Sequence, residues 1–288
     1  MEYKPIHNID VLKFKKNPYP DLQEMRAVNP ICFVPQVNAT MICDRDSIYE
    51  CEKNIDVFSS VQPLGLMTIL MGQNMMRKDG KAHAEERKAI FKTISPKTSR
   101  DYWRDKFETI ADTIIDKIKE LKSGDLLTLY AKELSAECLK LVTGLTNMTA
   151  AEMDRVSQGM IDGCSNYTGD SNIEINCNNC TQSIDAHINE MVHRKNRKSD
   201  FSMISTMLEG KLSTDQISAN IKLAISGGQN EPRDAIAGCI WAILNFELKE
   251  RLLEKKNWDQ LFNEYCRWMS PIGMSPREIA KNYSYKNI

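Results

Sequence analysis

Apolar residues recur at three- and four-residue spacing along most of the chain, a pattern typical of amphipathic helices. The clearest example spans residues 96–121, with apolar positions at Trp103, Phe107, Ile110, Ile114 and Ile118. The same periodicity predicts further helices over residues 21–27, 81–93, 126–143, 150–161, 183–193, 200–208 and 258–268. From residue 81 onward, the chain is therefore expected to be almost entirely helical.

Only the first sixty residues depart from this pattern. The segments ICFVPQ (31–36) and ATMICD (39–44) combine β-branched and aromatic residues between turn-forming residues, which predicts two short strands. The segment DSIYECEKN (46–54) predicts a helix with Asp46 as its N-cap. The predicted fold class is mainly α with a small β portion.

One predicted helix has an unusual middle. Ser213 and Gln216 form a Ser-x-x-Gln capping box, which marks a helix start. If this helix continues to Asn245, it is about 48 Å long at about 1.5 Å per residue. Its middle holds the segment SGGQNEPRDAIAG (226–238), which contains helix-breaking and polar residues.

This segment allows two interpretations. Pro232 has no amide hydrogen, and its ring collides with the carbonyl of Gly228. In one interpretation a first helix ends at the glycines and a second begins at Glu231 and Pro232. In the other, a single helix is locally widened, and Gly227 and Gly228 let a ligand approach the backbone. The residues alone leave both open.

Composition excludes several classes of protein. The 288 residues are 42% hydrophobic and 27% charged, as in a soluble globular domain, and the net charge is −1. Neither nucleic acid nor an anionic membrane is expected as the main partner. The N-terminus has no apolar signal-peptide core, and no stretch approaches the roughly 18 apolar residues of a membrane helix. A single cytoplasmic domain without a membrane anchor is expected.

The nine cysteines do not predict a metal site. Only Cys177 and Cys180 form a Cys-x-x-Cys pair, which His187 and His193 follow. Six residues separate Cys180 from His187, against about twelve in a zinc finger. The two histidines are six positions apart, so on a helix they point in different directions. A polar loop entering a helix is expected here, and the other cysteines are expected to be small buried side chains.

The unusual segment resembles the central helix of the soluble bacterial cytochromes P450. In that family an Ala/Gly-Gly-x-acid-Thr stretch forms the groove where oxygen binds over a haem. Gly227 and Gly228 fall on the small pair, and Asn230 and Glu231 fall on the acid–threonine pair. The resemblance implies that these four residues are the catalytic ones.

Two further segments carry the resemblance. RKDGKAHAEERKAIF (77–91) is similar to the family's His-x-x-x-Arg helix, so His83 and Arg87 would hold a haem propionate. Residues i and i+4 share a helix face and can offer two donors to one carboxylate. NEYCRWMSPIGMSPRE (263–278) is similar to the Glu-x-x-Arg helix, with Glu264 and Arg267 in a structural role. Arg277 falls where a second propionate partner often lies.

Segments 17–35 and 56–60 also resemble the family's N-terminal region, so the likeness covers nearly the whole chain. It implies a single P450 domain over residues 1–288 and a haem (iron protoporphyrin IX) cofactor. The implied activity is monooxygenation of a small apolar substrate, with electrons from a separate ferredoxin or flavoprotein reductase. The substrate pocket would be lined by residues 61–76 and the central helix. The methionines Met67, Met71, Met75 and Met76 would form an adaptable apolar wall or plain core.

The sequence departs from the family at the iron ligand. The family binds iron through a Phe-x-x-Gly…Cys-x-Gly loop after the Glu-x-x-Arg helix. No cysteine here is followed by glycine two positions later, and the sequence ends at Ile288. The expectation is a chain truncated before this loop, with no axial cysteine and no metal ligand. An alternative is a non-catalytic P450-derived remnant, a helical binding module without haem, whose exposed apolar faces favour self-association.

A second departure lies in the oxygen groove, where Asn230 and Glu231 replace the acid and the threonine. A carboxyl group near a dry pocket has a raised pKa and can deliver protons. Glu231 is therefore the candidate proton donor.

Overall fold

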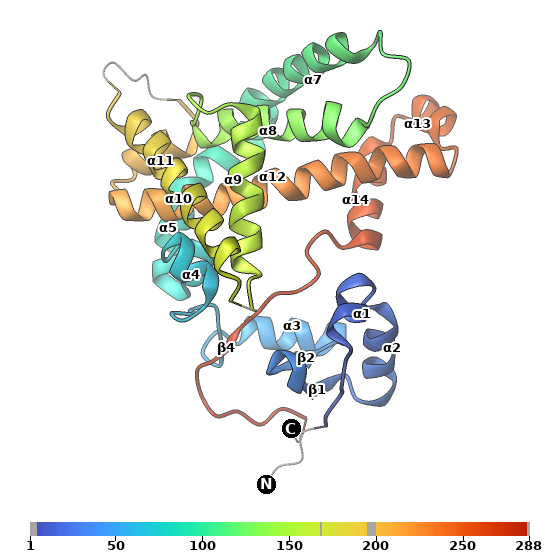
Figure 1. The fold of residues 1–288 in the computed structure, drawn as a ribbon, viewed down its shortest axis with the longest axis vertical. Helices are drawn as coiled ribbons and strands as arrows, with labels where there is room; N and C mark the ends of the chain where they lie inside the picture. The colour runs from blue at the N-terminus through green and yellow to red at the C-terminus, as the bar shows by residue number, and fades with distance from the viewer. Residues whose placement is uncertain (1–4, 168, 195–199, 287–288) are drawn as a thin grey trace. The chain divides into compact units, whose positions relative to one another are not determined.

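The computed structural model describes residues 5–167, 169–194 and 200–286. Within these limits the chain forms two compact units (Figure 1). The first contains the residues up to Val61 together with those from Pro276 onward, and the second is Gln62–Ser275.

The first unit is built on a β-hairpin. Strands β1 (Ile31–Val34) and β2 (Ala39–Ile42) pair antiparallel, with Ile31 opposite Ile42, so both predicted strands are confirmed. Helices α1 (Val11–Lys16) and α2 (Tyr19–Val28) precede the hairpin and α3 (Arg45–Lys53) follows it. A second short pair joins β3 (Phe58–Ser59) to β4 (Glu278–Ile279). Met25, Cys32 and Val34 are buried at the centre of this unit.

The predicted N-cap of α3 is wrong. The side chain of Asp44, not of Asp46, accepts a hydrogen bond from the Ser47 amide at 2.9 Å. Asp44 has the extended backbone that an N-cap needs (φ −101°, ψ 143°), whereas Asp46 already lies in the first helical turn. There Asp46 pairs with Arg45 at the surface.

The second unit is helical. Its α-helices are α4 (Leu66–Met71), α5 (Gly80–Ile94), α6 (Pro96–Thr98), α7 (Arg104–Ile118), α8 (Lys132–Thr143), α9 (Ala150–Cys164), α10 (Ser171–Val192), α11 (Met203–Glu209), α12 (Thr214–Asn245), α13 (Lys249–Lys255) and α14 (Trp258–Met269). A 3₁₀ turn, η2 (Met75–Arg77), precedes α5, and π-helical turns η3 (Ser99–Trp103) and η4 (Leu127–Ala131) lead into α7 and α8. The predicted mainly α fold class is confirmed.

Helix α12 is a single continuous helix of 32 residues with Pro232 inside it. Both bonds of the predicted capping box are present: the Gln216 amide donates to Ser213 Oγ at 3.3 Å, and the Ser213 amide donates to Gln216 Oε1 at 3.0 Å. The interpretation in which the glycines end one helix is therefore wrong.

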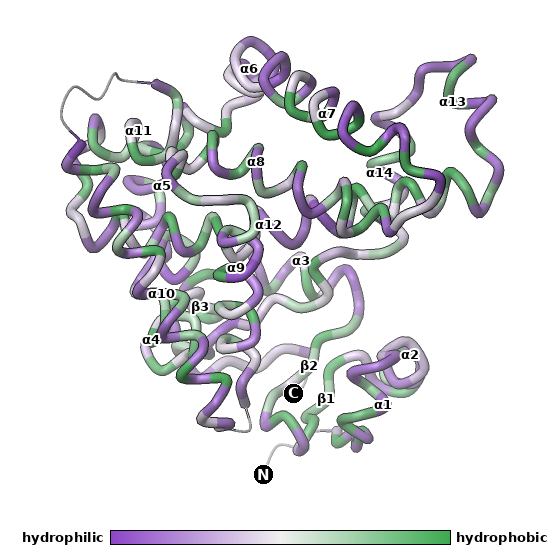
Figure 2. Tube along the Cα trace, turned by 45° about the horizontal axis from the view of Figure 1, so that its top comes forward, coloured by the Kyte–Doolittle hydropathy of each residue, from purple (hydrophilic) through white to green (hydrophobic). Residues whose placement is uncertain are grey.

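The core of the second unit surrounds α12. Helices α8 and α9 pack against it, and α9 crosses it steeply in Figure 1. Apolar and polar stretches alternate along these helices (Figure 2), as an amphipathic pattern requires. The largest fully buried side chains here are Ile90, Leu145, Met148, Met153, Met160, Ile184, Ile188, Ile204, Met207, Ile217 and Ile221.

Helix α14 packs against α12 but leaves much of its apolar surface exposed. Trp241 of α12 stacks on Trp268 of α14 with ring centroids 6.0 Å apart, and Phe246 meets both rings edge-on. All three side chains are about half exposed. The expected exposed apolar face therefore exists in this chain, and self-association through it stays a prediction.

Helix α10 begins twelve residues before its predicted start. Asp170 caps it, and Cys177 and Cys180 lie buried inside the helix rather than in a polar loop. The asparagine-rich sequence resembles a loop, but its buried positions Cys177, Cys180, Thr181 and Ile184 follow helical spacing. Among the residues that the structure describes, no cluster of His, Cys, Asp or Glu could hold a metal ion.

Small residues let α9 and α10 approach closely. A methyl group added at Gly159 of α9 would overlap Cys180 Sγ and would lie 3.0 Å from Asn176 Nδ2. Gly159 is therefore required by the contact between the two helices.

We predict that Gly159→Ala destabilises the protein by about 1–3 kcal/mol, the range for overpacking a core. Because Cys180 Sγ is the closest obstacle, Cys180→Ala in the same chain should recover part of this loss. Urea unfolding of both single variants and the double variant measures it. Strictly additive losses would contradict the proposed steric cause.

Candidate functional site

One face of α12 carries the residues that define the candidate site. Gly227 and Glu231 follow Asn220 by seven and eleven positions, which returns them to within about 20° of the same helix face. Asn220 on this face contacts η2 and α5 directly. The face that meets α5 at one end of α12 therefore continues to Gly227 and Glu231 near its middle.

Glu231 folds back over Gly227. The three atoms closest to a Cβ built on Gly227 all belong to the Glu231 carboxyl group, the nearest at 3.4 Å. Burial is the main cause that raises the pKa of Glu231 above its ordinary value, and nearby Asp234 adds to it. The oxygen Oε2 is buried and has no hydrogen-bond partner in the described part of the chain. A half-buried carboxyl group thus takes the space that a side chain at 227 would fill.

Asn230 faces away from this group. Its Nδ2 donates to Ser157 Oγ of α9 at 3.1 Å, and the Ser157 hydroxyl donates to the Ile225 carbonyl at 2.9 Å. Its neighbour Gln229 is fully buried and donates to Asp154 Oδ1 of α9 at 3.1 Å. Asn230 and Glu231, paired in the sequence prediction, thus lie on different sides of α12.

Gly228 packs against helix α8, and Pro232 follows it one turn later in α12. A Cβ on Gly228 would lie 2.7 Å from Leu139 Cδ1, so this glycine permits close helix packing. Pro232 cannot donate to the Gly228 carbonyl. The Ser135 hydroxyl of α8 donates to the Gln229 carbonyl at 2.8 Å and lies 3.4 Å from the Gly228 carbonyl. The Ser135 hydroxyl thus lies near the Gly228 carbonyl, which has lost its backbone donor to Pro232.

The predicted propionate pair lies on α5. Nδ1 of His83 is 2.9 Å from the Met75 carbonyl oxygen. Arg87, one turn later, is exposed and makes no hydrogen bond or ion pair within residues 5–167, 169–194 and 200–286. The predicted helix and the shared face are confirmed. Arg87 has donors left for an anion, and His83 has one at Nε2 when its ring is the imidazolium.

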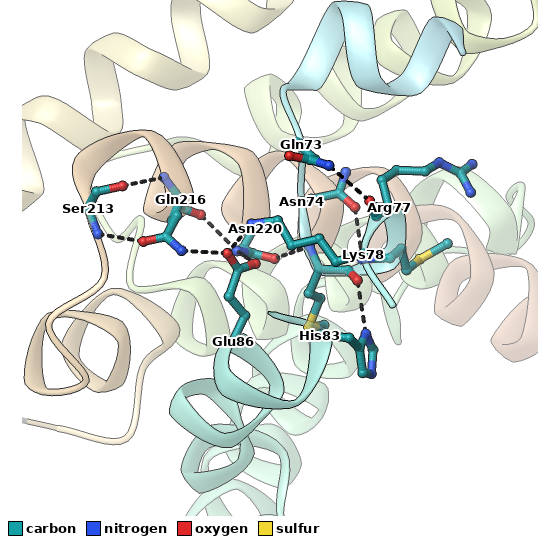
Figure 3. Close-up of polar contacts among 11 residues, drawn as sticks. Gln73, Asn74, Arg77, Lys78, His83, Glu86, Ser213, Gln216 and Asn220 are labelled. Atoms are coloured by element: carbon teal, nitrogen blue, oxygen red, sulfur yellow. Dashed lines mark hydrogen bonds and ion pairs between the residues drawn. The ribbon is translucent and has the colours of Figure 1, made fainter. Parts of the chain in front are cut away.

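The most buried charge in this region, Glu86, has no signal in the sequence. Glu86 is 2% exposed and pairs with Lys78 through Oε1, which also accepts a hydrogen bond from Gln216 Nε2 at 2.7 Å. Its Oε2 accepts a hydrogen bond from Asn220 Nδ2 at 2.9 Å. Figure 3 shows this carboxylate between α5, the η2 segment and the first turns of α12.

The Glu264–Arg267 pair is present on α14. Arg267 Nε and Nη2 each lie 2.7 Å from a Glu264 oxygen, a bidentate geometry, and both side chains are mostly exposed. Arg267 lowers the pKa of Glu264. Arg277 lies in the first unit, where its Nη2 is 3.5 Å from Glu52 Oε1. Their structural and propionate-binding roles stay predictions.

Burial raises the pKa of eight cysteine thiols in the described residues. Burial raises the pKa of Cys43 and Cys177 to about 11, and that of Cys138 and Cys164 to about 12. Burial also raises the pKa of Cys32, Cys51, Cys180 and Cys239. These eight thiols remain protonated at neutral pH. Cys32, Cys51, Cys177 and Cys180 are the small buried side chains among them.

Of the four candidate pocket methionines, three belong to the core. Met71 is fully buried, and Met67 and Met75 pack against the same core. Met76 is the exposed one. The plain-core interpretation therefore fits Met67, Met71 and Met75.

No family model matches the sequence. The fold, however, is that of the cytochromes P450. P450BioI, solved with an acyl carrier protein that carries hexadec-9Z-enoic acid, superposes with a TM-score of 0.83 at 19% identity, over 97% of this chain and 75% of its own.

Two other cytochromes P450 agree. CYP109E1 from Bacillus megaterium, in complex with testosterone, gives a TM-score of 0.83 at 18% identity, over 96% of this chain and 74% of its own. PksS from the bacillaene polyketide synthase of Bacillus subtilis gives 0.81 at 20% identity, over 96% and 72%. The fold expected from the sequence resemblance is confirmed. In the described residues, no helix is both long and apolar enough to cross a membrane.

We predict that Pro232→Ala stabilises the protein by up to about 3 kcal/mol, because it restores a helix donor for the Gly228 carbonyl. Ser135→Ala should cost about 1 kcal/mol in the natural sequence. It should cost less in the Pro232→Ala background, where the helix supplies a donor for the Gly228 carbonyl and Ser135 is needed only for the Gln229 carbonyl. Chemical unfolding of the four variants forms a double-mutant cycle. Equal costs in both backgrounds would show that Ser135 does not compensate for the proline.

Proposed function

We propose that this protein provides the propionate-binding and oxygen-side residues of a P450-type haem monooxygenase. The observation that carries the proposal is the shared face of α12. The helix that presents His83 and Arg87 contacts this face at Asn220, and the face continues to Gly227 and the buried carboxyl group of Glu231. Haem would supply the iron that activates oxygen for insertion into a small apolar substrate.

The residues fit part of a haem. Arg87 and His83 offer donors one turn apart, which suits a carboxylate. Gly227 lets the Glu231 carboxyl group lie against α12, and Glu231 Oε2 is a buried oxygen that lacks a partner in the part described. No cysteine has glycine two positions later, as the family's iron-binding loop requires, so no iron-based step is assigned to this chain.

Within this proposal Glu231 is the proton-holding group. A carboxyl group with a raised pKa keeps its proton closer to neutral pH than an exposed one, and it releases the proton more readily than a threonine hydroxyl. Its place over Gly227 is the position that the resemblance assigns to the acid–threonine groove. Asn230, bound to Ser157, positions α9 against α12 and orients the helix.

The proposal includes a separate electron donor, a ferredoxin or a flavoprotein reductase, and a cytoplasmic location. It assigns the propionate role to Arg277 as well, and the scaffold role to the bidentate Glu264–Arg267 pair.

Titration with hemin tests the proposal. We expect Arg87→Ala to weaken hemin binding about tenfold, a loss of about 1.4 kcal/mol, because a charge-assisted bond to a propionate is removed. Lys88→Ala is the matched control, since it removes a neighbouring exposed charge from the same helix. Absorbance titration measures both. Equal effects of the two changes would show that Arg87 acts only through net charge.

A second candidate function is a haem-free helical binding module. The sequence favours it, because no cysteine is followed by glycine two positions later as in the family's iron-binding loop. The same titration separates the two: a folded chain that takes up no hemin supports the binding module. If hemin binds, its reduced carbon monoxide complex should lack the red-shifted Soret band of a thiolate-ligated haem.

The raised pKa of Glu231 predicts a pH dependence of stability. Because the folded-state pKa exceeds the unfolded value, stability is greatest below the unfolded pKa and falls as pH rises through the folded pKa. Glu231→Gln should therefore stabilise the protein above this window and have little effect below it. Urea unfolding across acidic to neutral pH measures the difference.

Glu264→Gln is the control of opposite sign. Arg267 lowers the pKa of Glu264, so the stability that this pair contributes is present above the unfolded pKa and is lost as pH falls through the folded one. A Glu231→Gln difference that does not grow with pH would contradict burial of the Glu231 carboxyl group.

A further inference from the structure

The polar groups around Glu86 continue as a chain of hydrogen bonds to His83. Asn220 Nδ2 donates to Glu86 Oε2 at 2.9 Å and to the Gln216 carbonyl at 2.8 Å. Its other side-chain atom, Oδ1, accepts a hydrogen bond from the Met75 amide at 2.9 Å. The carbonyl of Met75 then lies 2.9 Å from His83 Nδ1. Figure 3 shows these contacts in one connected group.

The amide orientation of Asn220 is determined by its partners. A carboxylate oxygen and a backbone carbonyl can only accept, so the NH₂ group of Asn220 must face Glu86 and Gln216. Its carbonyl oxygen must then face the Met75 amide, which can only donate. Because Asn220 is fully buried, no water competes for these positions.

The turn that carries Met75 is held by hydrogen bonds within itself and to α12. Asn74 caps it locally, through Oδ1 and the Met76 amide at 3.0 Å. The Asn220 bond ties this same turn to α12, which lies 145 positions away in the sequence. Asn220 thus helps to hold the Met75 carbonyl beside α5, together with the Lys78 amide, which donates to that carbonyl at 3.3 Å.

The Met75 carbonyl also determines which nitrogen of His83 carries the proton. A carbonyl oxygen has no proton to give, so Nδ1 must be the protonated nitrogen that donates to Met75. Nε2 has no partner among the described residues. The ring is therefore held at one nitrogen, and the other is left for a ligand. A carboxylate there would be bound by the imidazolium, which donates from both nitrogens.

We propose that Asn220 is a positioning residue for His83: acting through Met75, it orients the imidazole ring and holds its neutral form as the Nδ1–H tautomer. The inference rests on the proposed function only where it says what Nε2 binds, a haem propionate. The tautomer itself is a property of the chain without haem.

The test is ¹⁵N NMR of the histidine side chains in the haem-free full chain, at a pH where the rings are neutral. The chain has four histidines, and the His83→Gln spectrum identifies the resonances of His83. We expect the Nδ1–H pattern for His83 in the natural sequence. A predominant Nε2–H pattern would overturn the proposal without any variant of Asn220.

Asn220→Ala removes the acceptor for the Met75 amide and should shift His83 toward a mixture of both tautomers. Gln216→Ala is the matched control, because it removes another hydrogen bond to Glu86 and leaves Asn220 and Met75 joined. Its His83 spectrum should match the natural one. The same shift in both variants would reduce Asn220 to a general structural role, and no shift in Asn220→Ala would disprove the positioning role.

Two further variants keep the test decisive if Asn220→Ala does not fold. Asn220→Ser stays polar but is one bond shorter, so it should also lose the Nδ1–H preference. Asn220→Asp keeps the acceptor oxygen and should retain it, although a second carboxyl group beside Glu86 lowers stability. Loss of the preference in Asn220→Asp but not in Asn220→Ser would contradict the proposal.

Hemin titration separates this inference from the proposed function. If His83 binds a propionate, His83→Ala and Asn220→Ala should both weaken hemin binding several-fold, and Gln216→Ala should not. If His83→Ala leaves hemin affinity unchanged, the propionate role fails. The tautomer result would then still decide whether Asn220 positions the ring.

Discussion

The buried carboxylate of Glu86 constrains the region where α5, η2 and α12 meet. A carboxylate that is 2% exposed is stable only if its oxygens are paired and hydrogen-bonded. Lys78, Gln216 and Asn220 meet that requirement together, and they come from segments more than 130 positions apart in the chain. Removing any one partner leaves part of the charge uncompensated, so the three segments must come together as a set. The placement of His83 and of the first turns of α12 follows from this requirement of Glu86.

Local rules in the sequence predicted the helices and the start of α12 because these depend on neighbours. The Ser213–Gln216 capping box and the apolar periodicity act within one or two turns. The start of α10 was missed because its asparagines favour loops, while its burial against Gly159 depends on tertiary packing. The N-cap of α3 was misplaced because two aspartates stand two positions apart, and only the backbone angles distinguish them.

In the candidate site, too, features set by sequence neighbours were predictable and features set by tertiary packing were not. His83 and Arg87 could be paired from sequence because i and i+4 share a helix face. Glu86, between Glu85 and Arg87, looks like one more exposed charge, and only its distant partners reveal that it is buried. Asn230 and Glu231 are adjacent in sequence, so the motif groups them, but successive residues on a helix point about 100° apart. That rotation places Asn230 against α9 and leaves Glu231 over Gly227.

The two sides of α12 differ in how their polar groups are satisfied, and this difference bears on the proline. Toward α8 and α9, Ser135 and Ser157 donate to carbonyls of α12. Ser135 Oγ also lies 3.4 Å from the Gly228 carbonyl, which Pro232 leaves without its helix donor. These bonds from neighbouring helices let the helix continue through a residue that removes one of its own donors. Toward Gly227, the Glu231 carboxyl group keeps a buried oxygen without a partner among the described residues. A helix held firmly on one side and incompletely satisfied on the other is suited to present a reactive group, because the packed side fixes the backbone while the open side retains chemistry.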